Sequence, residues 1–465
     1  MIGKIFKAYD VRATYPSPLD EAAAWKVGFA AATYIREVRK PGEQPGVQLS
    51  GTLLVSRDMR THSAALSAAL CEGIRAAGMD VLDLGMCDTS FGYFAVNHLG
   101  AAGCIQTTAS HNPAHYNGFK ISGPHAKPIG APTGLLEIQA IAEKLGDDRP
   151  AAVGSYGELD LWSAYRAHVL GFYRFGGRKL KVFVDGSNGM AGKMVPAVFG
   201  GVEGLELVPV NFEITGSFVH EPNPLVAENM LPTQEGTRSH GADAGACFDG
   251  DADRCIFCDE TGAILGCDHL TALFARHFLE ESPGAAVVYD LRSSKVVEEQ
   301  VRGLGGVPVR SRVGHVFLKQ ALRESYGVMG GELSGHFYFR GNYFADSGAI
   351  AFAVLASMLS SGSARLSELV APLRKYPQSG EINFSCEDKA GALSAVKARF
   401  AGSGSVDELD GVSVDCWESA GWWANIRASN TEPLLRLNLE AREQATLDRM
   451  LGEIMPMLGT RQHGH

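Results

Sequence analysis

The sequence predicts an α/β protein with three similar mixed α/β domains, mostly parallel sheets and a smaller C-terminal α+β domain. Three observations support this prediction. The chain has 465 residues, more than a single hydrophobic core usually supports. A strand, a helix and a second strand recur three times along it. After about Pro372 this order gives way to a different arrangement of strands and helices.

Each of the three repeats consists of a strand, a helix and a second strand. Parallel neighbours need a crossover connection of this kind, whereas antiparallel strands can be joined by a short turn. The predicted elements are 53–58, 63–77 and 80–84, then 181–185, a helix ending near 199 and 205–210, and then 286–290, 295–303 and 307–309. We therefore expect mostly parallel sheets in all three repeats.

The C-terminal part of the chain has another pattern. Strands are predicted at 381–385, 422–427 and 434–439, and helices at 390–400 and 447–458. This arrangement is typical of a small α+β domain. Together with the three repeats, it predicts domains at residues 1–150, 151–255, 256–370 and 371–465.

The composition argues against several classes of protein. Lys and Arg number 42 and Asp and Glu 52, a formal net charge of −10, which disfavours nucleic acid as the main partner. A local basic cleft for an anionic substrate is compatible with this total. The first residues lack the apolar segment of a signal peptide, and the most apolar run, 349–359, is too short to span a bilayer. We expect a cytoplasmic protein that does not bind membranes.

The nine cysteines are scattered without a disulfide-like spacing, which fits a reducing compartment. Cys255 and Cys258 have the spacing of a redox or zinc-binding pair. They lie in an apolar run that is typical of a strand, where positions three apart point to opposite faces. We therefore expect both thiols to be buried strand side chains.

Each repeat is followed by further residues that end in a polar loop. These loops lie around Ser110, at 249–254 and at 330–336. In open α/β sheets, functional groups lie on the loops at the carboxyl ends of the strands. We expect the three loops to converge on one central cleft.

The second loop contains three alternating aspartates, Asp249, Asp251 and Asp253. In an extended segment alternate side chains point the same way, so the carboxylates repel one another unless a hard divalent cation lies between them. A calcium-binding EF-hand is disfavoured because its loop needs glycine at the sixth position, where Arg254 stands. The other alternative is a solvated acidic turn, which the apolar flanks on both sides disfavour.

Ser110 lies in the segment TTASHNP (107–113), directly after an apolar strand. The chain has no Gly-x-Ser-x-Gly sequence, which argues against an esterase. A serine combined with a divalent-cation site suits phosphoryl transfer, in which the protein mainly positions groups and neutralises charge. Taken alone, the segment is also compatible with a turn that caps a helix.

Two further segments carry groups that suit phosphate or sugar. Residues 427–433 (RASNTEP) combine a guanidinium with hydroxyl and amide donors, and successive N–H groups in such a turn can form an anion nest. Glu332, Ser334 and His336, with His315 and Lys319 upstream, offer partners for sugar hydroxyls and for proton transfer. The alternatives are an ordinary polar turn and structural histidines.

Taken together, these loops resemble the phosphohexomutase family and, within it, the phosphomannomutase/phosphoglucomutase branch. The similarity covers nearly the whole chain, and five motifs occur in the family's order. They are FKAYDVR at 6–12, TTASHNPAHYNGFK at 107–120, DGDADR at 249–254, GELSGH at 331–336 and RASNTEP at 427–433. The resemblance implies four domains around a central cleft, carrying in turn the phosphoserine, metal, sugar and phosphate loops.

The resemblance also implies roles for individual residues. Ser110 would carry the phosphoryl group, and Mg²⁺ would bind to an oxygen of the phosphoserine and to Asp249, Asp251 and Asp253. The catalytic groups beside Ser110 would be Lys120, Arg254, His315 and His336, with the lysine and the histidines as candidate acids or bases. Substrate contacts would come from Tyr9, Arg12, Glu332, Ser334, Arg427, Ser429, Asn430 and Thr431.

The reaction implied by the resemblance interconverts hexose 1-phosphate and hexose 6-phosphate through phospho-Ser110, with glucose or mannose 1,6-bisphosphate as intermediate and activator. Residues 429–431 (SNT) resemble the mannose/glucose branch, whereas phosphoglucosamine mutases usually have Ser-Gly-Thr there. The chain departs from the family pattern at Ala13, where glycine is usual, and at Leu333, where methionine is common. The alternatives are a phosphoglucosamine mutase, a Mg²⁺-dependent sugar phosphatase and an inactive sugar-phosphate-binding protein.

Overall fold

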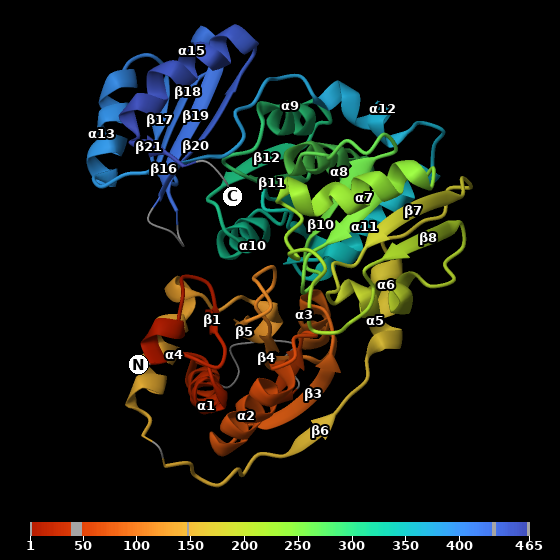
Figure 1. Cartoon of the computed structure of the whole chain (residues 1–465), viewed down its shortest axis with the longest axis vertical. Coiled ribbons are helices and arrows are strands. Elements are labelled where there is room, and N and C mark those ends of the chain that lie inside the picture. The colour runs from red at the N-terminus through yellow and green to blue at the C-terminus, as the bar shows by residue number, and fades with distance from the viewer. Residues whose placement is uncertain (1, 39–48, 147, 430–433, 463–465) are drawn as a thin grey trace. The chain divides into compact units, whose positions relative to one another are not determined.

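The computed structural model describes residues 2–38, 49–146, 148–429 and 434–462. The chain divides into two compact units. Figure 1 labels their helices and strands. The first contains residues 1–265 and 334–367, and the second contains residues 266–333 and 368–465. Each unit therefore combines two stretches that are separated in the sequence.

The first sheet of the first unit has the strand order β1-β5-β4-β2-β3-β6. The pairs β2–β3, β2–β4 and β3–β6 are parallel, whereas β5 runs antiparallel to β1 and β4. An aliphatic core lies where α1, α2 and α4 pack on the sheet, and α3 packs against β2 and β4. The strands are β1 (Val11–Thr14), β2 (Leu49–Arg57), β3 (Asp80–Met86), β4 (Ala101–Thr107), β5 (Tyr116–Ser122) and β6 (Tyr156–Glu158). The helices are α1 (Glu21–Val38), α2 (Ser63–Ala76), α3 (Thr89–Leu99) and α4 (Leu135–Lys144).

The second sheet of the first unit has the order β10-β9-β7-β8, with β10 antiparallel and the other pairs parallel. Its strands are β7 (Leu180–Asp185), β8 (Leu205–Val210), β9 (Ala244–Phe248) and β10 (Cys255–Asp259). The associated helices are α5 (Trp162–Leu170), α6 (Ala191–Phe199), α7 (Ala227–Ser239) and α11 (Gly348–Ser360). The late segment 334–367 also contains the antiparallel pair β14 (Phe337–Phe339) and β15 (Ala345–Asp346), which is not part of this four-stranded sheet.

Helix α11 is the apolar helix that the sequence predicts at 349–359. Ser347 caps it by accepting a hydrogen bond from the Ile350 N–H. Every residue of the helix except Met358 is buried, and the helix packs against β7, β10 and α5. No helix in the described ranges has the length and apolarity needed to cross a membrane.

The second unit begins with a parallel arrangement and ends with an antiparallel one. In the first part β11 pairs in parallel with β12 and β13. The strands are β11 (Ala286–Asp290), β12 (Val307–Ser311) and β13 (Met329–Gly331). The helices are α8 (Cys267–Glu281), α9 (Lys295–Gly303) and α10 (His315–Glu324). The chain passes from the first unit to the second for the last time within a short helix, α12 (Leu366–Val370).

The C-terminal sheet is antiparallel throughout, in the order β17-β18-β19-β20-β16-β21 (blue in Figure 1). Its strands are β16 (Ile382–Ser385), β17 (Ser405–Asp407), β18 (Val412–Cys416), β19 (Trp422–Ala428), β20 (Leu434–Ala441) and β21 (Thr460–Arg461). Helices α13 (Lys389–Phe400) and α15 (Gln444–Ile454) share one core with the sheet, and α14 (Trp417–Ala420) is a single turn.

The predicted fold class is confirmed, with mostly parallel sheets in the repeats and an antiparallel C-terminal sheet. The three repeats coincide with β2–α2–β3, β7–α6–β8 and β11–α9–β12. Among the strands that the sequence did not predict are β1, β5, β17 and β18, which are short or interrupted by polar residues. Cys255 and Cys258 are free thiols buried in β10, as expected. The four-domain division and the role of each domain stay predictions.

Candidate active site

The three aspartates of the second loop lie in the tight connection between the antiparallel strands β9 and β10. All three are fully buried, and their carboxylate oxygens lie within 4.8 Å of one another. Oδ1 of Asp251 and Oδ1 of Asp253 are buried without a hydrogen-bond partner in the part of the chain that the structure describes. Buried carboxylate oxygens without a hydrogen-bond partner fit a divalent cation with oxygen ligands.

Two helix N-termini hold the backbone of this loop. The Thr89 N–H, at the start of α3, donates to the Asp251 carbonyl over 3.1 Å, and the Met190 N–H, before α6, donates to the Gly250 carbonyl over 2.9 Å. The Thr89 hydroxyl also donates to Oδ2 of Asp251 over 2.6 Å. Because a helix N-terminus carries partial positive charge, both helices stabilise the carboxylates.

Lys120 provides one full positive charge beside the aspartates. Its Nζ lies 2.7 Å from Oδ2 of Asp251 and 2.6 Å from Oδ2 of Asp253. Burial lowers the lysine pKa, but the carboxylates outweigh this effect and raise it above its usual range. Burial together with the charges of Asp253 and Asp251 raises the pKa of Asp249 well above its usual value. The loop therefore has more carboxylate charge than Lys120 balances.

Ser110 lies directly against this loop. Its Oγ donates to Oδ2 of Asp249 over 2.9 Å, and its backbone φ is +51°, in the left-handed region that L-residues rarely adopt. A Cβ atom on Gly250 would lie 2.3 Å from the Ser110 carbonyl oxygen, so the two loops can meet only because residue 250 has no side chain. The structure thus places the predicted serine and the predicted metal ligands in contact.

His111 and Arg254 complete the surroundings of Ser110. Nη2 of Arg254 donates to Nδ1 of His111 over 2.6 Å. This Nδ1 of His111 lies 3.3 Å from Ser110 Oγ. Burial and, next, the Arg254 charge lower the pKa of His111 well below its usual value. His111 is therefore a neutral imidazole whose Nδ1 accepts the hydrogen bond from Arg254.

Arg12, one of the predicted substrate contacts, lies beside the Ser110 loop in the first unit. Its Nη1 donates to Oδ1 of Asn112 over 2.6 Å, and its Nη2 pairs with Asp10. Tyr9 directly precedes that aspartate and is partly buried. Substitution of the usual glycine by Ala13 leaves β1 paired with β5.

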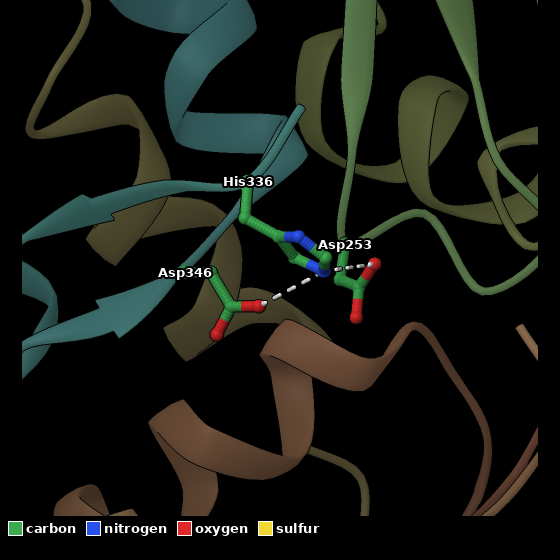
Figure 2. A group of neighbouring side chains, drawn as sticks. All are labelled: Asp253, His336 and Asp346. Carbon is green, nitrogen blue, oxygen red and sulfur yellow. Dashed lines mark ion pairs between the residues drawn. The ribbon is translucent and has the colours of Figure 1, made fainter. Parts of the chain in front are cut away.

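His336 lies between two carboxylates, as Figure 2 shows. Its Nε2 is 3.6 Å from Oδ1 of Asp253 and 3.8 Å from Oδ2 of Asp346, while its Nδ1 is 2.8 Å from Ser334 Oγ. Burial raises the pKa of Asp253, but Lys120 and His336 lower it to about 2, so this carboxylate stays ionised. The imidazole therefore connects the metal loop to β15.

Glu332 belongs to the second unit, at the end of β13. Its Oε1 accepts a hydrogen bond from the Gly314 N–H over 3.0 Å, directly before His315 and α10. Arg292 approaches the same oxygen at 3.8 Å and pairs with Asp290 at 2.9 Å. This arrangement fixes the predicted sugar-binding carboxylate beside a buried guanidinium.

Arg427, at the end of β19, lies in a cluster of arginines around one carboxylate. Glu381 is 3.4 Å from Arg427, 3.1 Å from Arg292 and 3.0 Å from Arg436. Burial and the neighbouring Arg292 charge lower the pKa of Arg427. Ser429 follows the strand, with its N–H donating to the Leu434 carbonyl. Asn430 and Thr431 lie outside the described residues.

Comparison with known proteins identifies the chain. Four segments match the domains of the phosphoglucomutase/phosphomannomutase family: residues 3–149 match α/β/α domain I, 163–262 domain II, 267–376 domain III and 381–457 the C-terminal domain. The chain belongs to the phosphoglucomutase/phosphomannomutase family. It is a phosphohexomutase enzyme.

Individual relatives of this phosphohexomutase match over almost their whole length. It is 38% identical over 467 residues to a phosphomannomutase of Salmonella montevideo, covering 98% of this chain and 99% of that protein. It is 39% identical over 448 residues to phosphohexose mutases of Xanthomonas campestris pv. campestris, covering 95% and 96%. A solved phosphoglucomutase/phosphomannomutase family protein from Burkholderia thailandensis has a TM-score of 0.87 and 31% identity, covering 98% and 97%.

Beside the predicted site residues lie groups that the sequence does not single out. In the first unit they are Arg60, Thr89, His111 and Asp346, and in the second unit Arg292. Only two of them carried a signal in the sequence: His111 follows Ser110 directly, and Arg292 follows the polar end of a predicted strand. The others come from segments whose approach to the site depends on the tertiary fold.

Proposed function

We propose that this phosphohexomutase interconverts hexose 1-phosphate and hexose 6-phosphate, with mannose, glucose or both as the sugar, through a phosphoserine at Ser110. The observation that carries the proposal is the 2.9 Å contact between Ser110 Oγ and the metal loop at Asp249. The names of the relatives, phosphomannomutase and phosphohexose mutase, support the same substrate class. Hexose 1,6-bisphosphate is the intermediate, and glucose or mannose 1,6-bisphosphate primes the unphosphorylated enzyme.

The proposed metal is Mg²⁺, held by Asp249, Asp251 and Asp253 together with an oxygen of the phosphoserine. The support is the excess of buried carboxylate charge and the two Oδ1 atoms without hydrogen-bond partners among the described residues. When bound, the ion neutralises charge on the transferring phosphoryl group. Lys120 and Arg254 add positive charge beside Ser110 in the same region.

In the proposed transfer, a sugar hydroxyl takes the phosphoryl group, and the bond between phosphorus and Ser110 Oγ breaks. The hydroxyl proton must pass to a base, and the leaving Ser110 Oγ must take up a proton from an acid. Lys120, His315 and His336 are the candidates, and His336 is favoured because Asp253 and Asp346 flank its Nε2. The reverse transfer from the other end of the bisphosphate returns the phosphoryl group to Ser110.

Substrate binding is proposed to use both ends of the hexose phosphate. Glu332 and Ser334 would accept and donate hydrogen bonds to sugar hydroxyls. The phosphate that does not react would be held by Arg427, Ser429, Asn430 and Thr431, and the lowered pKa of Arg427 is consistent with a guanidinium that an anion stabilises. Tyr9 and Arg12 would contact the reacting end.

Mannose and glucose are the proposed sugars because residues 429–431 read SNT. A phosphoglucosamine mutase remains a second candidate on family grounds, and a Mg²⁺-dependent phosphatase a third. All nine cysteines are free thiols, which supports a reducing compartment and therefore a cytoplasmic location.

The proposal is tested by coupled assays with mannose 1-phosphate and glucose 1-phosphate in parallel, with Mg²⁺ and glucose 1,6-bisphosphate present. The wild-type enzyme should form the 6-phosphates, and Ser110→Ala should fold but lose turnover. Ser67→Ala is the matched control, because Ser67 Oγ is a buried hydroxyl without a hydrogen-bond partner among the described residues. Stoichiometric release of inorganic phosphate would indicate a phosphatase, and turnover by Ser110→Ala would exclude the phosphoserine mechanism.

A further inference from the structure

We propose that Arg60 is a positioning residue for Ser110: its buried guanidinium fixes the backbone of the serine loop. This inference rests on the proposed phosphoserine function. Arg60 lies in the turn between β2 and α2, away from the five motifs that carry the family resemblance. Its side chain is fully buried.

All five N–H groups of the guanidinium are used. Nη2 donates to the carbonyls of Ser110 (2.9 Å) and Asn112 (2.6 Å), and Nη1 donates to those of Pro113 (2.7 Å) and Tyr116 (3.0 Å). Nε donates to Oδ2 of Asp58 over 3.1 Å. One side chain therefore binds four carbonyls of a single seven-residue segment.

The serine loop needs such partners because it contains no helix or strand. Residues 108–115 lie between β4 and β5, and buried carbonyls outside regular structure must find other donors. His62, two residues after Arg60, contacts the Ala114 carbonyl through Nε2 at 3.1 Å, and the Asp58 N–H donates to the Thr107 carbonyl over 2.9 Å. The hydrogen bonds from the turn at 58–63 thus determine the backbone conformation of the serine loop.

The guanidinium itself is held in place. Oδ1 of Asp58 accepts hydrogen bonds from the Arg60 N–H and from the Ser63 hydroxyl, while Oδ2 pairs with Nε. The ring of Phe218, from the connection between β8 and α7, lies over the guanidinium at 5.3 Å. A lysine at this position would keep the charge but could not match the planar arrangement of five donors.

The consequence for catalysis follows from the conformation of Ser110. Its φ of +51° places Oγ toward Asp249, and its carbonyl lies between Arg60 Nη2 and Gly250. A non-glycine residue keeps such a φ only where its surroundings determine it. Without the hydrogen bonds from the turn at 58–63, Oγ moves relative to the metal loop. A displacement of about 1 Å slows a reaction between positioned groups by roughly 100-fold.

The test compares the phosphoryl-transfer step in the wild type, Arg60→Lys and Arg166→Lys, using each full-length chain with Mg²⁺. The matched control, Arg166, also donates to backbone carbonyls, those of Ala197, Val198 and Gly200, but far along the chain from Ser110. Each protein is phosphorylated with glucose 1,6-bisphosphate, and mass spectrometry follows loss of the Ser110 phosphoryl group to glucose 1-phosphate and to water.

We expect Arg60→Lys to slow transfer to the sugar about 100-fold while KM changes only a few-fold, and Arg166→Lys to transfer at the wild-type rate. A wild-type transfer rate in folded Arg60→Lys, or equal slowing in Arg166→Lys, would overturn the inference. If Arg60→Lys does not fold, Asp58→Asn replaces it, with slower transfer expected and a wild-type rate overturning the inference. Absence of phosphorylation on Ser110 in the wild type would instead overturn the proposed function and, with it, this inference.

Discussion

At the scale of single residues, the site depends on a position that has no side chain, Gly250. Gly250 separates two of the aspartates, and a Cβ atom there would collide with the carbonyl oxygen of Ser110. The backbone of the metal loop can therefore approach the serine closely enough for Oγ to reach Asp249. The same carbonyl also accepts a hydrogen bond from Arg60, so neither partner can move away without cost.

Gly250→Ala should lower kcat by roughly one to two orders of magnitude, because its Cβ would lie 2.3 Å from the Ser110 carbonyl oxygen and push the loops apart. Steady-state assays at saturating Mg²⁺ measure this effect. Gly452→Ala is the control, since it lies in α15 with open space around its Cβ. Unchanged kcat in Gly250→Ala would show that the close approach is not needed.

The residues that were predictable from the sequence share one property: each lies in a short segment whose neighbours carry the same chemistry. Asp249, Asp251 and Asp253 alternate within one loop, and Ser110 follows a strand. Thr89 and Asp346 could not be found this way, because they reach the aspartates from a helix N-terminus and from a late strand. Their contribution depends on packing between segments far apart in the chain.

At the scale of elements, helix α3 connects the core of its sheet to the metal loop. Asp88 caps the helix through Oδ2, which accepts hydrogen bonds from the Phe91 N–H (3.1 Å) and from the Tyr165 hydroxyl (2.7 Å). Thr89, the next residue, binds Asp251 through both its N–H and its hydroxyl. The position of the helix N-terminus therefore determines where this carboxylate lies.

Asp88→Asn should remove a pH dependence of stability. Burial raises the pKa of Asp88 to about 7, although the hydrogen bonds from Tyr165 and Phe91 oppose the shift. The unfolded carboxyl ionises near its ordinary value of 3.8, so between these pH values folding takes up a proton and wild-type stability falls as pH rises. The asparagine keeps both acceptor contacts and does not titrate.

Thermal denaturation from about pH 5 to about pH 8 measures this difference. The melting temperature of the wild type should fall relative to that of Asp88→Asn across the range. Ser90→Ala, at the neighbouring position of α3, alters no titratable group and should follow the wild-type profile. Parallel profiles for the wild type and Asp88→Asn would contradict the raised pKa.

The elements that were predictable had long apolar runs with a regular period, such as β2, α2 and α11. The strands that were missed had weaker patterns. β5 contains Asn117, Gly118 and Lys120. Lys120 pairs with the aspartates, and Gly118 lies where β1 approaches too closely for a side chain. β18 alternates Val with Ser and Asp, and its pairing with β19 determines its structure more than its own propensity does.

At the scale of the whole molecule, the proposed ligands are divided between the two units. Ser110 and the three aspartates belong to the first unit, whereas Arg427, Ser429 and Glu332 belong to the second. A metal ion and a phosphate ion, added separately, should therefore stabilise different parts of the chain.

Hydrogen-exchange mass spectrometry tests this division. Mg²⁺ alone should protect peptides that contain residues 107–120, 249–254 and 87–90, because it relieves repulsion among buried carboxylates, and should leave peptides around Arg427 unchanged. Inorganic phosphate alone should protect peptides around Arg427. Asp251→Asn should lose the Mg²⁺ effect but keep the phosphate effect. Protection by Mg²⁺ of the Arg427 region alone would contradict the assignment of the metal site.

The order of the chain also has a consequence for biosynthesis. Helix α11 covers β7 and β10, yet residues 266–333, which belong to the other unit, are translated between these strands and the helix. A ribosome releases the N-terminal part first, so the nascent sheet waits with an uncovered apolar face. His336 and Asp346 arrive in the same late stretch as α11. The first unit therefore completes its folding only after residues 266–333 of the second unit have been synthesised. During that interval a chaperone could bind the exposed apolar face of the sheet.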